Sequence, residues 1–327
     1  MSGPLPRAEA TAPDLLLRIA ARRRERLAEA GPRDAGPLAS ASGVLGPGDN
    51  PFLAALANPP RAGVATAGAA SQPEGAASHP ETSRSPAPTA RAAAPPPPES
   101  PRSPAAPAII AEVKMGSPRL GSLQDRVDPI AQARLYAANG AAALSVVVEP
   151  DFFFGSYELL AACRTASGLP AIAKDFVVDP MQLVWARRAG ADAVLLIAAL
   201  YEPEELAHYA RIARGLGLAP LIETHDAADL VRLAGEPWEL VGVNNRDLRT
   251  FTVDLERSIA LLPLLPPGAL KVAESGIRDA LDVAFLADSG FDALLIGESL
   301  LLAEDPAAML RAFGGSPRHR RQEEVSG

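Results

Sequence analysis

The sequence that decides the fold starts with the stretch IIAEVK at residues 109–114. Its first five residues are mostly apolar, which is typical of a buried strand, and the stretch ends on a lysine. Similar runs recur along the chain, at 109–113, 143–148, 170–173, 193–197, 219–222, 240–243, 270–273 and 292–296. The segments between them, such as 128–139 and 202–215, are rich in Ala, Leu, Arg and Glu and have helical character. Eight strands alternating with helices over about 200 residues predict an α/β fold, the (β/α)8 TIM barrel.

A doubly wound open sheet is the alternative fold with the same alternation of strands and helices. Folds of that kind bind dinucleotides through a G-x-G-x-x-G motif that directly follows the first strand. No such motif follows residues 109–113. The barrel is therefore the favoured fold.

Two further segments precede the predicted barrel domain at 108–314. Residues 1–58 are predicted to form an N-terminal helical extension, with an amphipathic helix at 13–30 and a short apolar segment at 51–57. Residues 59–107 contain 13 prolines among many Ala and Ser, a composition that buries too little apolar surface to fold. We therefore expect a disordered Pro/Ala-rich linker between the two.

The linker contains a run of four prolines, Pro95–Pro98, that can adopt the polyproline II conformation. A plain spacer is the favoured interpretation of this segment. A docking site for an unknown partner is the alternative. After the barrel domain, residues 315–327 are expected to form a disordered tail.

Composition argues against several classes of protein. The net charge of −8 does not suit non-specific nucleic-acid binding, which requires a basic surface. A single cysteine, Cys163, excludes an intrachain disulfide and fits a reducing compartment. The N-terminus lacks the apolar core of a secretory signal, and the longest apolar runs, such as 194–200, fall far short of the ~20 residues of a membrane span. We expect a cytoplasmic protein without nucleic-acid or membrane partners.

Lysine is rare in this chain. Of 31 basic residues only Lys114, Lys174 and Lys271 are lysines, and GC-rich coding explains the many arginines but not these three positions. A lysine with a depressed pKa can give up its proton, whereas arginine effectively cannot. Lys114 and Lys174 end apolar runs and Lys271 begins one, so a functional role is favoured for the first two only.

Polar side chains gather at the ends of the predicted strands, where the active site of a barrel lies. They are Glu112, Lys114, Lys174, Glu223, Asn244, Arg246, Glu274 and Glu298. Glu112 and Lys114 are two residues apart, so their side chains point to the same side of a strand. One charge at a strand end is more often simply solvated. A cluster of opposite charges, however, can tune a lysine or a glutamate for acid–base catalysis.

Glycine and serine follow the seventh and eighth runs, as Ser275-Gly276 and as Gly297-Glu298-Ser299. Glycine lets backbone N–H groups approach an anion, and many barrels bind phosphate at these two loops. We therefore predict a phosphorylated small-molecule substrate. The four histidines, among them His225, are scattered without metal-ligand spacing, so neither a metal nor a cofactor is expected. His225 follows the fifth run closely enough to lie near the site, but a loop residue is the favoured interpretation.

Aromatic residues follow the second and third runs, as Phe152 to Phe154 and as Phe176. Packing under a loop and lining a pocket for a planar apolar substrate are equally good interpretations of this cluster.

Seven motifs, in this order along residues 109–313, resemble the indole-3-glycerol-phosphate synthase family. They are IIAEVKMGSP (109–118), FFGSYE (153–158), KDFVV (174–178), LIETHD (221–226), VGVNNRDL (241–248), KVAESGI (271–277) and LIGESLL (295–301). The helix at 13–30 and the FLAAL segment at 52–56 also resemble the N-terminal extension of that family. The resemblance implies a carboxy-lyase of tryptophan biosynthesis that needs no cofactor. It would convert 1-(o-carboxyphenylamino)-1-deoxyribulose 5-phosphate to indole-3-glycerol phosphate, with loss of CO2 and water.

The resemblance also implies residue roles. Lys174 would be the general acid of ring closure, and Lys114 would attract the substrate carboxylate. Glu223 would be the acid and base of the dehydration, supported by Glu112 and Asn244. The remaining expected substrate-binding residues are Ser117, Ser275, Gly276, Gly297, Glu298 and Ser299 around the phosphate, Phe153, Phe176, Val147 and Leu195 around the aromatic ring, and Arg246 and Glu274 beside them.

The first loop departs from the family pattern. Its S-P-R-L-G stretch has Arg119 where a serine is usual, and Met115 and Gly116 stand where a basic and a small residue are more usual. Phe154 occupies a position that often holds a polar or small residue. These changes bear on substrate affinity and loop motion more than on the reaction.

Two other functions are less consistent with the sequence. The related barrel phosphoribosylanthranilate isomerase would need a Cys/Asp pair at strand ends, but Cys163 falls inside a predicted helix. A non-catalytic scaffold that docks through the Pro-rich segment would be expected to have lost at least one of the charged strand-end residues, and none is lost.

Overall fold

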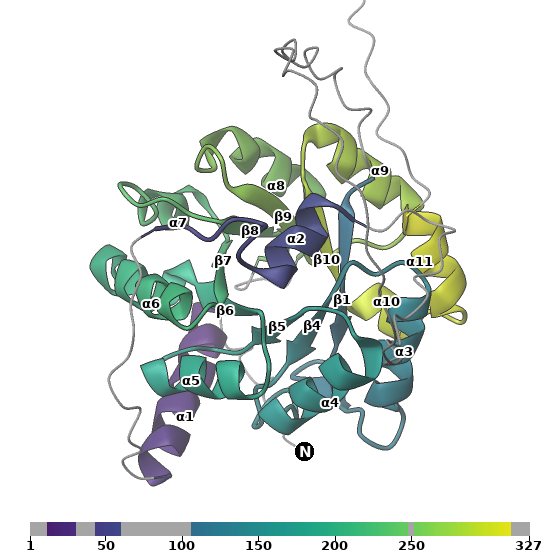
Figure 1. Cartoon of the computed structure of the whole chain (residues 1–327), viewed down its shortest axis with the longest axis horizontal. Coiled ribbons are helices and arrows are strands. Elements are labelled where there is room, and N and C mark those ends of the chain that lie inside the picture. The colour runs from purple at the N-terminus through teal and green to yellow at the C-terminus, as the bar shows by residue number, and fades with distance from the viewer. Residues whose placement is uncertain (1–11, 31–42, 60–105, 248–251, 315–327) are drawn as a thin grey trace, which may run out of the picture.

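The computed structural model describes residues 12–30, 43–59, 106–247 and 252–314 (Figure 1). Residues 60–105 of the predicted linker and the predicted tail at 315–327 lie outside these ranges, so the two disorder predictions stay predictions. Within the described ranges, no helix is both long enough and apolar enough to cross a membrane.

Eight parallel strands close into a barrel in the order β1-β10-β9-β8-β7-β6-β5-β4, which confirms the predicted fold. The strands are β1 (Ala108–Val113), β4 (Ala143–Val147), β5 (Ala171–Lys174), β6 (Ala193–Ile197), β7 (Ala219–Thr224), β8 (Leu240–Asn244), β9 (Leu270–Glu274) and β10 (Ala293–Ile296). β7 extends two residues beyond the predicted run, so Glu223 belongs to the strand and pairs in register with Ile197 of β6.

Helices follow the strands and form the outer ring. They are α3 (Pro129–Ala138), α4 (Tyr157–Ser167), α5 (Pro180–Arg188), α6 (Pro203–Gly215), α7 (Ala227–Val231), α8 (Leu255–Leu261), α9 (Ala280–Ser289), α10 (Glu298–Leu302) and α11 (Pro306–Gly314), with 3-10 turns η1 (Ala198–Leu200) and η2 (Leu262–Leu264). Six of them begin at an aspartate whose side chain accepts from backbone N–H groups of the first turn: Asp128, Asp179, Asp226, Asp254, Asp279 and Asp305. Such caps satisfy N–H groups that the helix itself leaves unpaired.

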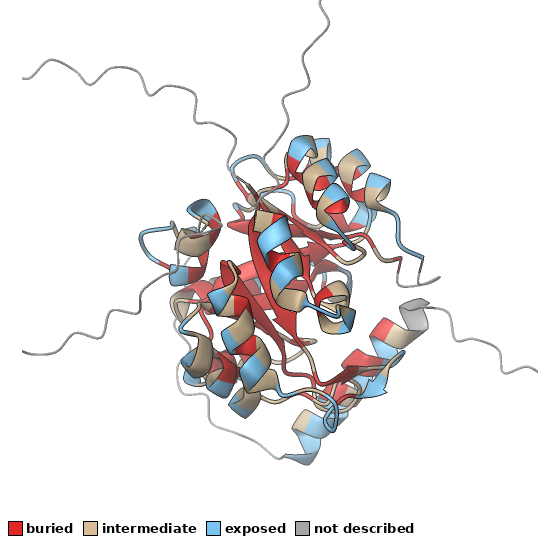
Figure 2. Cartoon of the chain, turned by 90° about the vertical axis from the view of Figure 1, so that its right-hand side faces the viewer, coloured by how far each residue is buried: buried red, intermediate tan, exposed pale blue. Residues whose placement is uncertain are grey.

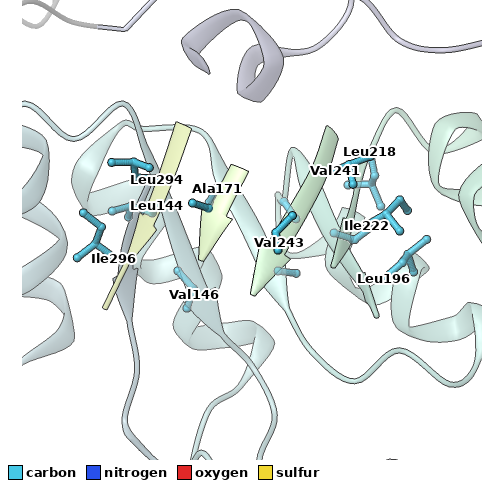
Figure 3. Packing of buried hydrophobic residues seen from close by; sticks show 14 of the residues in the cluster. Leu144, Val146, Ala171, Leu196, Leu218, Ile222, Val241, Val243, Leu294 and Ile296 are labelled. Carbon is cyan, nitrogen blue, oxygen red and sulfur yellow. The ribbon is translucent and has the colours of Figure 1, made fainter. Parts of the chain in front are cut away.

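The apolar core has two layers, one on each side of the barrel wall. Outward-facing strand residues such as Val241 and Leu294 pack against the helices (Figure 3). Inward-facing residues such as Ile110, Leu221 and Val272 fill the barrel interior. The strands are buried along their length, and the helices alternate buried and exposed faces (Figure 2). Because both faces of each strand are covered, the strands read as continuous apolar runs in the sequence.

The short helix α2 (Pro51–Ala57) closes the N-terminal end of the barrel and lies over the ring of strands (Figure 1). Phe52 and Leu53 belong to the interior layer of the core. Asn50 caps α2, and its amide donates to Asp192 O at 2.7 Å and to Gly217 O at 3.1 Å. Both acceptors precede strands, so this amide ties the helix to the N-terminal strand ends.

Helix α1 (Ala12–Glu29) agrees with the predicted helix to within one residue at each end. Its buried residues include Leu16 and Ile19. Leu16 joins the interior layer of the core from the C-terminal side of the barrel, opposite α2. The two predicted parts of the N-terminal extension therefore cover opposite ends of the barrel.

Candidate active site

A cavity of about 940 Å³ opens at the C-terminal ends of the strands. Residues from every strand, or from the loop that follows it, line this cavity. It contains all of the predicted site residues except one: Glu112, Lys114, Ser117, Val147, Phe153, Lys174, Phe176, Leu195, Glu223, Asn244, Arg246, Ser275, Gly276, Gly297, Glu298 and Ser299. The exception is Glu274, which is buried beneath it.

Lys174, the last residue of β5, lies at the centre of the charged cluster. Its Nζ lies 2.9 Å from Glu274 Oε2 and 3.5 Å from Glu223 Oε2. Burial alone would lower the pKa of Lys174, but the carboxylates of Glu274, Glu223 and Glu112 outweigh burial and raise this pKa. The expectation that a depressed pKa explains this lysine is therefore wrong, because the site holds Lys174 as a cation.

Glu274 ends β9 and is fully buried, with its carboxylate turned to Lys174. Burial raises the pKa of Glu274, and the nearby Glu223 adds to that rise while Lys174 opposes it. Glu274 does not line the cavity and pairs with the lysine, and the expectation that it binds the substrate stays a prediction.

Glu112 and Lys114 form a second pair on the rim of the cavity, at the end of β1. Lys114 Nζ lies 2.8 Å from Glu112 Oε1, which confirms that residues two apart on this strand point to the same side. Burial would raise the pKa of Glu112, but Lys114 and Lys174 together lower it. Glu112 is therefore held as a carboxylate beside Lys114.

Glu223 has a different partner at each of its two carboxylate oxygens. Oε2 faces Lys174 at 3.5 Å, and Oε1 lies 3.2 Å from His225 Nε2. Burial would raise the pKa of Glu223, but Lys174, His225 and the Asn244 side chain hold it well below its usual range. Glu223 is therefore ionised in this arrangement.

His225 was interpreted as a loop residue, and the structure places it directly behind Glu223. Burial would lower the pKa of His225, but Asp229 and Glu223 raise it to about 10. The sequence did contain a signal for this contact, because Glu223 and His225 have the same two-residue spacing as Glu112 and Lys114.

The loops after β9 and β10 form the part of the cavity predicted to bind phosphate. Ser275 and Gly276 both have left-handed backbone conformations, with φ of 67° and 77°. A Cβ at Gly276 would overlap the Val253 side chain, so this turn requires glycine. Ser299 Oγ donates to Ile277 O at 2.6 Å, which ties the two loops together.

Glu298 begins α10 and lies between two arginines at the mouth. Arg246 Nη2 is 3.5 Å from Glu298 Oε2, and Arg119 of the first loop pairs with Glu298 Oε1. The first loop carries the short hairpin β2 (Gly116–Ser117) and β3 (Gly121–Ser122). Arg119, a departure from the family pattern, thus connects this loop to the predicted phosphate site.

The aromatic cluster divides between two locations. The rings of Phe153 and Phe176 lie 6.0 Å apart and line the cavity beside Val147 and Leu195. Phe152 and Phe154 are not among the lining residues, and the Phe154 ring lies against Gly116 of the first loop. One wall of the cavity is therefore apolar and aromatic.

Helix α1 completes that wall, which the sequence did not predict at the level of residues. Leu15, Leu16 and Ile19 line the cavity. Arg23, one turn further along, pairs with Asp175, the residue that follows Lys174. Lys271, for which no functional role was favoured, lies near the start of β9 and outside the cavity. Within the described ranges, no group of His, Cys, Asp and Glu side chains is arranged to hold a metal ion.

The mouth of this barrel holds a buried cluster of a lysine and carboxylates, the two loops predicted to bind phosphate, and an aromatic wall. These features together define an enzyme of the (β/α)8-barrel class. The family model for indole-3-glycerol phosphate synthase matches residues 99–313, and the chain belongs to that family.

Two relatives illustrate the similarity, and both are described as indole-3-glycerol phosphate synthase. The protein of Microcystis aeruginosa is 47% identical over 207 residues, which cover 62% of this chain and 70% of the relative. The protein of Carboxydothermus hydrogenoformans is 43% identical over 206 residues, 63% of this chain and 78% of the relative. Among solved structures, 3-hexulose-6-phosphate synthase from Salmonella typhimurium matches with a TM-score of 0.51 at 14% identity, over 63% of this chain and 96% of that one. The last similarity shows the fold alone.

Proposed function

We propose that this chain is an indole-3-glycerol-phosphate synthase that uses Lys174 and Glu223 as its two proton-transfer groups. The reaction closes the indole ring of 1-(o-carboxyphenylamino)-1-deoxyribulose 5-phosphate and releases CO2 and water. The observation that carries the proposal is the placement of Lys174 Nζ between Glu274 at 2.9 Å and Glu223 at 3.5 Å, at the mouth of the barrel.

Lys174 serves ring closure as the general acid. As the aromatic carbon attacks the ketone, negative charge develops on the ketone oxygen, and a cationic lysine stabilises that charge and donates its proton to the oxygen. The raised pKa of Lys174 favours this role, because the ammonium group is fully protonated before the substrate binds. The alkoxide that forms is more basic than an amine, so the proton transfer runs downhill.

Lys114 orients the carboxylate that leaves as CO2. It already binds an anion in this structure, the carboxylate of Glu112 at 2.8 Å, and the substrate carboxylate would replace or share that partner. Loss of CO2 restores the aromatic ring, since the electron pair of the broken bond remains in it. Lys174 thus acts at the ketone oxygen of the substrate, and Lys114 binds its carboxylate.

Glu223 serves the dehydration. Its lowered pKa makes it a carboxylate that first accepts a proton from the ring-closed intermediate and then, as the acid, supplies one to the departing hydroxyl. Asn244 and Glu112 flank it in the cavity and support the proposed transfers by holding sugar hydroxyls. The remaining contacts place the phosphate at Ser117, Ser275, Gly276, Gly297 and Ser299, and the aromatic ring between Phe153 and Phe176.

A fluorescence assay for indoleglycerol phosphate tests the proposal with the purified full chain. We expect turnover by the wild type and none detectable by Lys174→Arg, because arginine keeps the charge but does not release a proton. Lys271→Arg is the matched control, since Lys271 lies outside the cavity, and it should turn over like the wild type. Equal turnover by Lys174→Arg and the wild type would refute the role of Lys174.

The domain organisation is part of the same proposal. Residues 1–58 cover the two ends of the barrel at 108–314, and residues 59–107 are a spacer. The enzyme is cytoplasmic and has neither nucleic-acid nor membrane partners. Deleting residues 61–106 should then leave kcat nearly unchanged. A large loss of kcat would show instead that the segment positions α1.

A further inference from the structure

His225 contacts Glu223 but does not line the cavity. We propose that His225 is a positioning residue for the reaction: its imidazolium binds Glu223 Oε1 and so directs Oε2 toward Lys174 and the substrate. This inference rests on the proposed function, because it assigns a partner to the acid–base carboxylate named there.

The geometry restricts Glu223 from two sides. His225 Nε2 lies 3.2 Å from Oε1, and Lys174 Nζ lies 3.5 Å from Oε2, so each oxygen has its own cation. Ion pairs at both oxygens oppose the rotation that would exchange them. They favour one oxygen for proton transfer before the substrate arrives, which is a form of the preorganisation that catalysis requires.

His225 is itself held in place by helix α7. Its Nδ1 lies 3.4 Å from Asp229 Oδ2, and the same oxygen accepts from the His225 backbone N–H at 2.9 Å. Asp229 is buried, and the His225 side chain is 11% exposed. Asp229, His225 and Glu223 thus form a line in which a carboxylate orients an imidazole, and that imidazole orients the reacting carboxylate.

The two side chains that contact the imidazole both favour its protonated form. They are the carboxyl groups of Glu223 from β7 and Asp229 from α7. Arg232, the nearest other cation on that side, lies 4.0 Å from Asp229 Oδ1 and donates to Tyr201 O at 2.6 Å. On the far side of Glu223 stand Lys174 and Glu274, which pair with each other. Among the residues that the structure describes, His225 therefore contacts two carboxylates and no cation.

Removing the imidazole should release Glu223 rather than unfold the barrel. In His225→Asn, Glu223 keeps Lys174 but loses the cation at Oε1, and its proton affinity rises toward that of the neighbouring Glu274. An opposite charge at this distance typically shifts a carboxyl pKa by about 1–3 units. We expect the acid limb of the kcat profile to move to higher pH by about that amount, with KM nearly unchanged.

His208 offers the matched control, because it is exposed on α6. His208→Asn should keep the wild-type profile. Asp229→Asn keeps the imidazole but removes its orienting carboxylate, so it should shift the acid limb in the same direction by less. An acid limb that stays in place in His225→Asn, even if kcat is lower throughout, would reduce His225 to a structural role and overturn the inference.

Nuclear magnetic resonance on 15N-labelled histidine tests the contact without relying on turnover. The chain has four histidines, so the His225 signal is assigned by its loss in His225→Asn. We expect the wild-type His225 imidazole to remain protonated at about pH 8, where an unperturbed histidine with a pKa near 6.5 is neutral. Glu223→Gln should return its titration toward that value.

The two sets of results separate this inference from the proposed function. A wild type that makes no indoleglycerol phosphate would overturn the proposed function. An active wild type whose His225 titrates like a free histidine would overturn only the role of His225.

Discussion

Arg23 of α1 and Asp175 form a buried two-point ion pair across 152 residues of chain. Arg23 Nη2 lies 2.6 Å from Oδ2 and Nε lies 3.2 Å from Oδ1 of the carboxylate. Asp175 directly follows Lys174, and it also accepts from Tyr157 Oη at 2.9 Å and from Gln182 Nε2 at 2.9 Å. The helix that covers the cavity is therefore attached to the residue next to the proposed general acid.

Arg23→Met should cost about 3–5 kcal/mol of folding free energy, because it leaves the Asp175 carboxylate buried without its cation. We also expect kcat/KM to fall, because α1 would no longer hold Leu15, Leu16 and Ile19 in the cavity wall. Urea unfolding and the fluorescence assay measure the two effects. Arg22→Met is the control: the Arg22 side chain is 38% exposed, and its loss should change stability by less than about 0.5 kcal/mol. Equal effects of the two substitutions would contradict the role of the pair.

Gly297→Ala should reduce kcat by about 100-fold while the barrel remains folded. A Cβ at Gly297 would overlap Glu112 Oε1, so alanine must displace that carboxylate and, with it, Lys114. Displacements of about 1 Å in a catalytic group can cost a factor of this size. Gly48→Ala is the control, because nothing lies within 4 Å of a Cβ built there. Circular dichroism and steady-state kinetics on both variants check the prediction, and an unaffected kcat in Gly297→Ala would refute it.

Arg119→Ser should raise KM by about two- to fivefold, as expected for one partly exposed ion pair, and change kcat less. The substitution removes one of the two cations that balance Glu298 beside the predicted phosphate site, so the substrate phosphate meets a less compensated carboxylate. The difference from wild type should shrink at high salt, because salt screens exposed charges. Arg126→Ser, an exposed change outside the cavity, should leave KM unchanged. A lower KM in Arg119→Ser would contradict this account.

Cys163 should resist thiol reagents in the native protein and react only after unfolding. Its side chain is fully buried in α4, and burial raises the pKa of the thiol to about 11. The neutral thiol is favoured in the folded state, so this contribution to stability is complete below a pH of about 9 and is lost as the pH rises through about 11. The rate of labelling with a chromogenic disulfide, followed against urea, should match the rate of unfolding. Fast labelling at neutral pH in the absence of urea would refute the burial.

The barrel was predictable from the sequence because each strand is covered on both faces. That geometry requires short continuous apolar runs such as 193–197, and the sequence shows eight of them. The strand-end side chains could be named for a related reason, since parallel strands bring their C-terminal ends to one mouth. The residue at which each strand ends was harder to predict. β7 continues through Glu223 and Thr224, two polar residues that in the sequence suggest a loop.

Contacts that depend on docking could not be read from the sequence. The periodicity of α1 identifies an apolar face, but it does not say that Arg23 meets Asp175. The direction of the Lys174 pKa was also out of reach, because it depends on Glu274 and Glu223 lying within 3.5 Å of the same nitrogen. His225 does lie in the loop between β7 and α7, as interpreted, and its contact with Glu223 was accessible through their spacing.

The extension reaches both ends of the barrel, and its partners lie more than 140 residues further along the chain. Asn50 binds Asp192 and Gly217, Leu45 N donates to Glu239 Oε1 at 2.9 Å, and Arg23 binds Asp175. During synthesis the ribosome releases this segment first, yet its first partner, Asp175, is made only after three of the eight barrel strands, and its last, Glu239, just before the sixth. The part of each new chain that is made first therefore docks only after later strands have been made. The wall that Leu15, Leu16 and Ile19 give the cavity has to follow the synthesis of those strands.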